Sequence, residues 1–273
     1  MMRTLSVLTL AAAISACNPG GGDTPDDAAT PSPTATATPT PTATARATAN
    51  GARSVSEETD DFLFEYSYPA EAGRIAELAS QLDVMLEQQR GQLAKEWEDA
   101  RRDARADGFP YNKHSYTAEW KVVAALPGWL SLSNDVATYT GGAHGNYTLQ
   151  SLVWDKAKGE SMEAIDMFVS PAALEKALGS RFCDELNRQR AKRRDAPVSK
   201  DSDDPFSACP GIEELTVLVG SSNGRTFNRL TLYAGPYVAG PYAEGAYKVN
   251  LSINRAILDT VKPQFREAFS ARN

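Results

Sequence analysis

Apolar residues recur along the chain with periods that predict distinct strand and helix blocks. The run Phe62–Tyr68 is rich in aromatic side chains and ends at Pro69, which is typical of a strand. From Ile75 to Trp97, apolar side chains recur at steps of three and four, which predicts a long amphipathic helix. A tail of alternating charges follows, and Gly108 is expected to end this helix.

The central part of the chain predicts an antiparallel meander, because β-rich segments alternate with Pro-Gly and Gly-Gly turns. A second helix is expected after Ser170, which can cap it, and Pro171, which suits its first turn. The strands are predicted near 117–126, 130–139, 147–154, 215–219, 227–233 and 247–253, and a short last helix near 263–269. Strands and helices occur in clumps rather than as β-α-β units, so the predicted fold class is α+β.

The order of these blocks predicts four regions. Residues 1–16 are expected to be a signal peptide, and residues 17–54 a disordered tether that begins at a lipidated cysteine. Two small α+β modules of antiparallel sheet with packed helices are expected at 55–144 and 145–273.

The N-terminus has the charged-then-apolar order of an export signal, and its apolar stretch is too short to cross a bilayer. Ile14-Ser15-Ala16-Cys17 resembles a bacterial lipobox, which implies lipid on Cys17 and a membrane as partner. The alternative is an ordinary secretory signal cut near Ala16, which would leave a free thiol. In enteric lipoproteins, an aspartate directly after the lipidated cysteine resembles an inner-membrane retention signal. This chain has Asn18 there, which favours the outer membrane, with the folded part facing the periplasm.

The segment from Asn18 to about Ser54 is made of Pro, Thr, Ala, Gly and Ser. It has too few large apolar residues to offset the loss of chain entropy on folding, so we expect a disordered spacer. Its Thr-Pro steps favour an extended chain of about 3.1 Å per residue, which gives a reach on the order of 100 Å.

Composition then limits the classes of function. The chain has 35 acidic and 28 basic residues, a net charge of -7, which argues against nucleic acid as a partner. Besides Cys17 only Cys183 and Cys209 are present, an even pair in an oxidising compartment, so we predict a disulfide between them. The alternative is a pair of buried free thiols.

Motifs for catalysis are weak. Gly220-Ser-Ser-Asn-Gly224 fits the pattern of a hydrolase nucleophile, but a strand follows it, so it predicts a hairpin turn. With two histidines in the chain and no metal-binding or phosphate-binding spacing, neither a metal nor a cofactor is predicted, and no catalytic residue is assigned. Carboxylate pairs for glycoside hydrolysis depend on the fold, which leaves four unranked candidates: Glu65, Asp135, Asp155 and Glu244.

Two segments favour a binding site. In Thr140-Gly-Gly-Ala-His-Gly-Asn146, adjacent glycines permit a tight turn that would present His144 and Asn146. In the repeated Ala-Gly-Pro-Tyr segment, Tyr237 and Tyr242 would offer rigid amphipathic rings. The alternatives are structural: polar side chains that satisfy the turn's own backbone, and tyrosines packed inward.

The Gly-Gly-Ala-His-Gly-Asn segment, the later Trp154-Asp155 and Asp166-Met167-Phe168, and the segment from Tyr237 to Tyr247 together resemble a pair of envelope domains of unknown function. These domains are similar to the extracellular region of a lysozyme-binding anti-sigma factor and to the N-terminal region of a peptidoglycan N-acetyl deacetylase. The resemblance covers about 62–269, with its more diagnostic part near 145–260. The chain lacks the deacetylase's metal-binding histidine pairs, so catalysis is not implied.

The resemblance implies a non-catalytic envelope module that binds peptidoglycan or a wall-active protein such as a lysozyme. Two alternatives remain open: a hydrolase of envelope glycans, and a structural protein of envelope assemblies.

Overall fold

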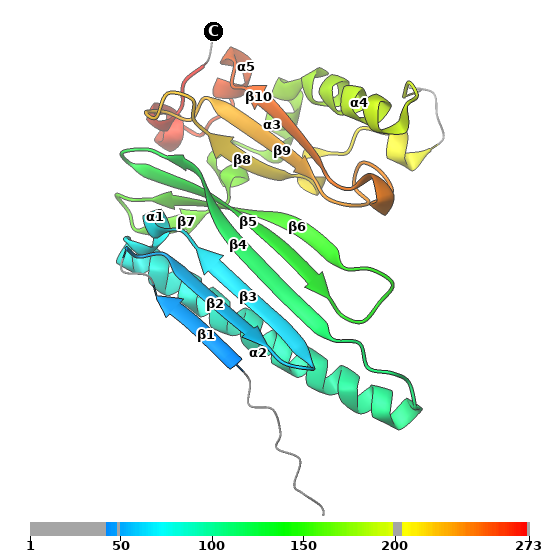
Figure 1. Ribbon diagram of the computed structural model, residues 1–273. Coiled ribbons are helices and arrows are strands. Elements are labelled where there is room, and N and C mark those ends of the chain that lie inside the picture. Colours follow the sequence, from blue (N-terminus) through cyan, green and yellow to red (C-terminus); the bar gives the residue numbers. More distant parts are fainter. Residues whose placement is uncertain (1–41, 48–49, 199–203, 272–273) are drawn as a thin grey trace, which may run out of the picture. The chain divides into compact units, whose positions relative to one another are not determined.

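A seven-stranded sheet forms the largest layer of the computed structural model, which describes residues 42–47, 50–198 and 204–271 (Figure 1). The strands follow one another in chain order. They are β1 (Thr42–Ala47), β2 (Arg53–Glu58), β3 (Phe62–Tyr68), β4 (His114–Ala125), β5 (Trp129–Tyr139), β6 (Asn146–Asp155) and β7 (Glu160–Met162). The predicted signal peptide and Cys17 lie outside the described residues.

One face of this sheet is covered by the predicted long helix, α2 (Ala76–Asp107), which follows the short α1 (Ala70–Gly73). Phe64 and Tyr66 of β3 alternate toward α2 and pack with Leu78 and Leu82 of the helix. Gly108 ends the helix in the left-handed conformation, as its position after the charged tail predicts.

The α+β class is confirmed, but the first sheet is mixed rather than antiparallel. β3 and β4 pair in parallel, and the other neighbouring strands of this sheet pair antiparallel. The reason is the long connection: α2 crosses the sheet between the two strands and returns the chain to the same end, whereas hairpins reverse it.

The structure also differs from the predicted tether. β1 and the first residues of β2 lie within 17–54, where a disordered spacer is expected. The segment Thr42–Ala47 alternates threonine or arginine with alanine and pairs antiparallel with β2 over its whole length. β-branched threonine suits an edge strand, and pairing with an existing sheet supplies the stability that this segment lacks alone.

A second, three-stranded antiparallel sheet has the order β10-β9-β8. Its strands are β8 (Thr216–Gly220), β9 (Arg229–Ala234) and β10 (Tyr247–Ser252), close to the predicted positions. α3 (Pro171–Leu178) and α4 (Arg181–Arg194) precede it, and α5 (Arg255–Leu258) follows it. Short 3-10 helices occupy Ala164–Met167, Pro205–Ser207, Ile212–Glu214, Tyr242–Glu244 and Pro263–Ala268.

The second helix begins as predicted, since the Ser170 hydroxyl accepts a hydrogen bond from the backbone N–H of Ala173 (3.1 Å) and Pro171 stands in the first turn. It ends at Gly179, whose positive φ of 56° breaks the helix, and the apolar stripe resumes in α4. The disulfide between Cys183 and Cys209 is present, with the two Cα atoms 5.7 Å apart.

Two large hydrophobic clusters hold these layers, one between the first sheet and α2 and the other around β8–β10 and α3–α5. β8 contacts β4, β5 and β6, so the second sheet packs on the face of the first sheet opposite α2. The boundary predicted between 144 and 145 lies in the loop that joins β5 to β6, two adjacent strands of one sheet. The division into two modules stays a prediction.

Candidate functional site

Two loops bring three of the predicted binding residues together. His144 lies in the loop between β5 and β6, and Tyr237 and Tyr242 lie in the loop between β9 and β10. The imidazole of His144 stacks on the Tyr242 ring, with centroids 3.8 Å apart and planes inclined by 20°. Its Nε2 is 3.1 Å from the Tyr237 hydroxyl, although the two residues are 93 positions apart. The fourth predicted residue, Asn146, is exposed at the start of β6.

The hydrogen bonds define how the His144 ring is held. Its Nδ1 is 2.9 Å from the carbonyl oxygen of Gly145, which can only accept, so Nδ1 carries the proton of the neutral ring. Nε2 then accepts a hydrogen bond from the Tyr237 hydroxyl. The Tyr242 hydroxyl donates to the same Gly145 carbonyl at 2.7 Å. A side chain at Gly145 would stand 2.9 Å from the carbonyl oxygen of Thr138, so glycine is required there.

Tyr237 has an unusual backbone for its residue type. Its φ is +68°, and the residue is 53% exposed. A non-glycine residue in this region costs on the order of 1–3 kcal/mol, and such strain is found mainly where function requires it. The Tyr237 ring is therefore held at the surface by a strained backbone.

Sequence reasoning missed one member of the cluster, Tyr147 of β6. Its ring meets that of Tyr242 edge to face, with centroids 6.1 Å apart, and its hydroxyl accepts a hydrogen bond from the backbone of Ala246. The signal was present in the sequence, since Tyr147 directly follows Asn146 in the glycine-rich segment. We call His144, Tyr147, Tyr237 and Tyr242 the aromatic cluster.

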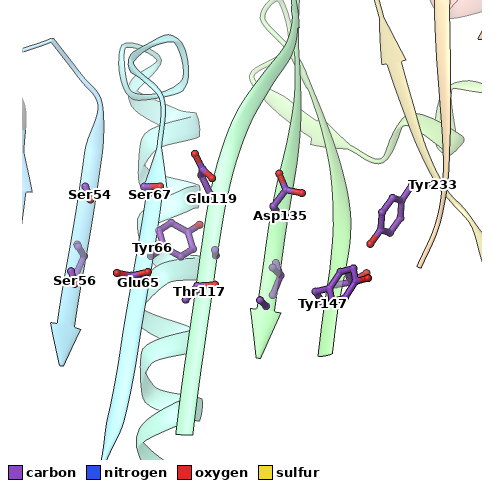
Figure 2. A pocket seen from close by; sticks show the side chains of 15 residues that line it. Ser54, Ser56, Glu65, Tyr66, Ser67, Thr117, Glu119, Asp135, Tyr147 and Tyr233 are labelled. Carbon is purple, nitrogen blue, oxygen red and sulfur yellow. The ribbon is translucent and has the colours of Figure 1, made fainter. Parts of the chain in front are cut away.

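Tyr147 also lines a groove of about 400 Å³ on the sheet face opposite α2 (Figure 2). Strand register places side chains of neighbouring strands, all polar except Ala137, in two rows across this face. One row is Ser56, Glu65, Thr117, Ala137 and Tyr147, and the other is Ser54, Ser67, Glu119 and Asp135. Tyr233 of β9 faces Tyr147 across one end of the groove. We call this surface the polar groove.

Charge in the polar groove is predominantly acidic. The Lys121 ammonium lies 2.8 Å from a Glu119 oxygen and 2.9 Å from an Asp135 oxygen, and these bonds raise the pKa of Lys121. Glu65 is exposed and lines the same groove. Burial, followed by the nearby Tyr147 and Asp135, raises the pKa of Tyr233 to about 12. The groove therefore offers hydroxyl groups and carboxylates as hydrogen-bond partners.

The four carboxylates proposed from the sequence have different roles in the structure. Glu65 and Asp135 line the groove, but β4 lies between their strands. Two strand spacings amount to about 10 Å, a wide separation for a glycosidase pair. Asp155 is buried and accepts hydrogen bonds from the backbone of Ala157 and Lys158 in a turn. Glu244 is bound by an arginine of α4, as described below.

The hydrolase-like motif forms a turn, as predicted. It joins β8 to β9, and the backbone N–H of Ser222 donates to the Asn228 side chain at 2.8 Å. The serine hydroxyl is 3.2 Å from the same oxygen, so its role is to stabilise the turn.

The second histidine, His114, is buried beneath the loop that carries His144. Its ring packs against Tyr111, with centroids 5.5 Å apart, and its Nδ1 has no hydrogen-bond partner. Burial lowers the pKa of His114, and the carboxylate of Glu96 and a hydrogen bond with the Thr140 backbone oppose this effect only in part. His114 is therefore neutral in the folded protein near pH 7.

We expect the free energy of unfolding to decrease as the pH falls below about 6.5. Because folding lowers the pKa of His114, the unfolded chain binds a proton first, and stability is lost below the unfolded-state pKa of about 6.5. The loss ends once the pH passes the folded-state pKa. Urea unfolding at a series of pH values measures this. His114→Gln should flatten the profile below about pH 6.5, and an unchanged decrease in this variant would contradict the assignment.

Comparisons with known proteins give one family match over part of the chain and structural matches over most of it. Residues 55–147 match the family model described as Deacetylase PdaC. A DUF3298 family member from Bacteroides fragilis NCTC 9343 is 14% identical, with 84% of this chain and 95% of that chain covered and a TM-score of 0.45. A DUF3298 family protein from Pseudomonas aeruginosa PAO1 is 16% identical, with 85% of this chain and 96% of that chain covered and a TM-score of 0.40. No curated protein matches.

The family match supports the coarser part of the resemblance drawn from the sequence, an envelope-related domain of unknown function. It lies on the first predicted module, whereas the resemblance placed its more diagnostic part near 145–260. The link to an anti-sigma factor is not shown by these matches. Among the described residues, no helix is both long and apolar enough to cross a membrane.

Proposed function

We propose that this chain is a non-catalytic binding module of the bacterial cell envelope that recognises the glycan strands of peptidoglycan. One observation carries the proposal: Tyr147 belongs to both the aromatic cluster and the polar groove, so the two form one continuous surface. The exposed rings of His144, Tyr147 and Tyr237, at one end of a groove lined by hydroxyl groups and carboxylates, have the character expected of a site for a sugar chain.

The chemistry of sugars fits both parts of this surface. Each pyranose has an apolar face of C–H groups, which can lie on an aromatic ring, and a rim of hydroxyl and amide groups, which need hydrogen-bond partners. Tyr237 and Tyr242 supply rigid rings at low entropic cost. The serine, threonine and carboxylate side chains of the polar groove supply convergent polar groups.

The family match supports an envelope-related domain, and the resemblance drawn from the sequence suggests a glycan as its ligand. The matching family is described as a deacetylase, and the sequence resembles the N-terminal region of an enzyme that acts on peptidoglycan. The proposed location agrees with this: lipid on Cys17 would hold the module at the outer membrane, facing the periplasm. A hydrolase is less favoured, because two of its four candidate carboxylates are occupied in structural contacts.

Cosedimentation of residues 39–273 with purified, insoluble peptidoglycan tests the proposal. This range is a compact unit that holds every described residue. We expect binding by the unaltered protein, and about tenfold weaker binding by Tyr242→Ala, since a ring contact of this kind contributes about 1.4 kcal/mol. Val84→Ala is the matched control, because Val84 is exposed on α2, on the other face of the sheet.

Three results would contradict the proposal. The first is that the unaltered protein does not sediment with peptidoglycan, and the second is that Tyr242→Ala binds as well as the Val84→Ala control. In the third, the protein would bind a purified lysozyme in solution but not peptidoglycan, which would support a wall-active protein as the partner.

A further inference from the structure

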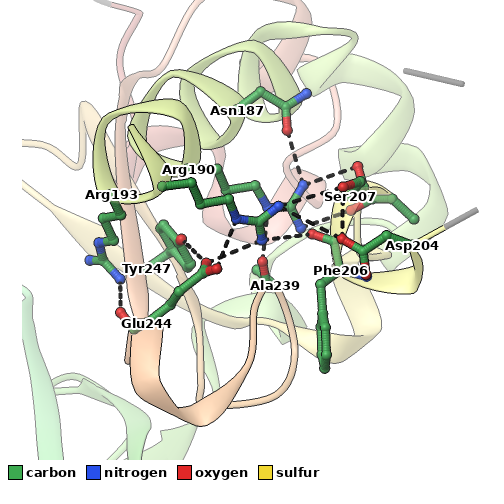
Figure 3. A network of polar contacts seen from close by, with 11 residues as sticks. Asn187, Arg190, Arg193, Asp204, Phe206, Ser207, Ala239, Glu244 and Tyr247 are labelled. Atoms are coloured by element: carbon green, nitrogen blue, oxygen red, sulfur yellow. Dashed lines mark hydrogen bonds and ion pairs between the residues drawn. The ribbon is translucent and has the colours of Figure 1, made fainter. Parts of the chain in front are cut away.

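Helix α4 carries a fully buried arginine, Arg190 (Figure 3). Its guanidinium forms hydrogen bonds to carbonyl groups of two other segments and to one side chain of α4. The Nε of Arg190 donates to the carbonyl of Ala239 at 2.8 Å. Nη2 donates to the carbonyl of Ala208 at 2.9 Å, and Nη1 to the carbonyl of Ser207 at 3.2 Å and to the Asn187 side chain at 3.0 Å. One guanidinium thus connects the loop that carries Tyr237 and Tyr242 to the segment just before Cys209.

Arg194, one turn further along the helix, makes a second connection between the same segments. Its Nε and Nη2 donate to the two carboxylate oxygens of Glu244 at 2.8 and 3.1 Å. Nη2 also donates to the carbonyl of Phe206 at 3.2 Å. Burial would raise the pKa of Glu244, but hydrogen bonds from Arg194 and Tyr247 outweigh it and hold this pKa below its usual range.

The neighbouring Arg193 completes the contact at the far end of the loop. It donates to the carbonyl of Ala246 at 2.8 Å, and its guanidinium lies 3.9 Å from the centre of the Tyr247 ring. Ala239, Glu244 and Ala246 are therefore all held by α4, and Tyr242 lies between the first two. The loop makes its contact with His144 from a backbone that this helix fixes.

The disulfide holds the other set of partners. Cys183 lies on α4, and Cys209 directly follows the carbonyls of 206–208 that Arg190 and Arg194 use. A buried guanidinium needs hydrogen-bond acceptors around it, because burial otherwise disfavours its charge. If these carbonyls move away, Arg190 loses two of its four hydrogen bonds and keeps those to Asn187 and Ala239. Fewer contacts then fix the direction of the guanidinium.

We propose that Arg190 and Arg194, together with the Cys183–Cys209 disulfide, are a positioning device that holds Tyr237 and Tyr242 in the arrangement that binds ligand. This inference rests on the proposed function of the aromatic cluster. It assigns the disulfide a local role in the binding surface, in addition to the general stabilisation that a closed loop gives.

Local and global effects are separated by two readouts. The imidazole proton signals of His144 in NMR spectra report its stacking on Tyr242, and amide hydrogen exchange of 235–246 reports the loop backbone. Thermal or urea unfolding reports the stability of the whole fold. A role limited to stability would lower the unfolding midpoint and leave the first two readouts unchanged below the transition.

The variants are Arg194→Gln, Glu244→Gln, their combination, and the double variant Cys183→Ser with Cys209→Ser. Each is expected to shift the His144 signals, to speed exchange in 235–246, and to weaken cosedimentation with peptidoglycan about tenfold. The combined variant should bind peptidoglycan no more weakly than Arg194→Gln alone, because each single substitution already removes the ion pair between Arg194 and Glu244. Arg188→Gln is the control: it lies on the same helix and bonds to Glu185 of its own helix.

Failure of this inference and failure of the proposed function give different results. If the unaltered protein does not bind peptidoglycan, the proposed function is wrong, but the NMR and exchange measurements still decide whether the loop is positioned from α4. If the His144 signals and the exchange of 235–246 in the variants match those of Arg188→Gln, the positioning role is overturned, whatever the unaltered protein binds.

Discussion

Replacing Arg190 with methionine is expected to lower the free energy of unfolding by about 3 kcal/mol. Methionine is of similar length but cannot donate, so the carbonyls of Ser207, Ala208 and Ala239 would lose a donor inside the protein. An acceptor left without a partner in the interior costs about 1–3 kcal/mol. Part of the loss is offset, because burial, and then the nearby Arg194, lower the pKa of Arg190 and so disfavour its charge.

Urea unfolding measures this difference from the transition midpoint, provided that the slope is unchanged. Arg188→Met is the matched control, since Arg188 is exposed and paired only within α4, and we expect a change within about 0.5 kcal/mol. Equal losses in the two variants would show that the buried hydrogen bonds of Arg190 add nothing to stability.

The main elements could be predicted because one face of each is buried. Phe62–Tyr68 alternates buried side chains toward α2, and the helix itself carries Leu78, Leu82 and Leu86 at steps of four. These periods are fixed by backbone geometry alone, so the sequence carries them directly. The end of the helix at Gly108 follows from the same local chemistry.

The departures from prediction depend on tertiary contacts. The pattern of β3 and β4 is the same for parallel and antiparallel pairing, and the path of α2 decides between them. The Thr-Ala segment of β1 has no core pattern of its own and becomes a strand by pairing with β2. No local signal separates these outcomes from the alternatives.

The candidate site could be predicted only in part, because the sequence carries local backbone composition and not the contacts between distant segments. Adjacent glycines and the Gly-Pro-Tyr repeat drew attention to His144, Tyr237 and Tyr242, because unusual backbone composition is visible in a sequence. Their mutual contact is not visible, nor are the rows of the polar groove, which require the register of β2 to β6.

The burial of Arg190 is harder to predict from the sequence than the aromatic cluster. This arginine lies in a basic run at the end of a helix, and such a run normally indicates a solvated face. Its burial depends on carbonyl groups from two loops that meet only in the folded chain. A buried charge of this kind has no periodic signature, although it holds the binding loop in place.

Replacing Cys17 with serine is expected to move the protein from the membrane fraction to the soluble periplasmic fraction. Each buried CH₂ of an acyl chain contributes about 0.8 kcal/mol, so two or three chains hold a protein on a bilayer almost permanently, whereas serine accepts no lipid by this route. Mass spectrometry of the mature N-terminus measures the attachment of lipid to Cys17, and fractionation of cells measures membrane association. Cys183→Ser is the control, because it removes a cysteine of the disulfide and leaves the anchor.

Cys17 and the other residues before β1, which begins at Thr42, lie outside the described part of the chain, so measurements on cells decide the anchored location. An unmodified Cys17 in the mature protein, or membrane association unchanged by Cys17→Ser, would overturn the anchored location and leave peptidoglycan binding to be explained without it.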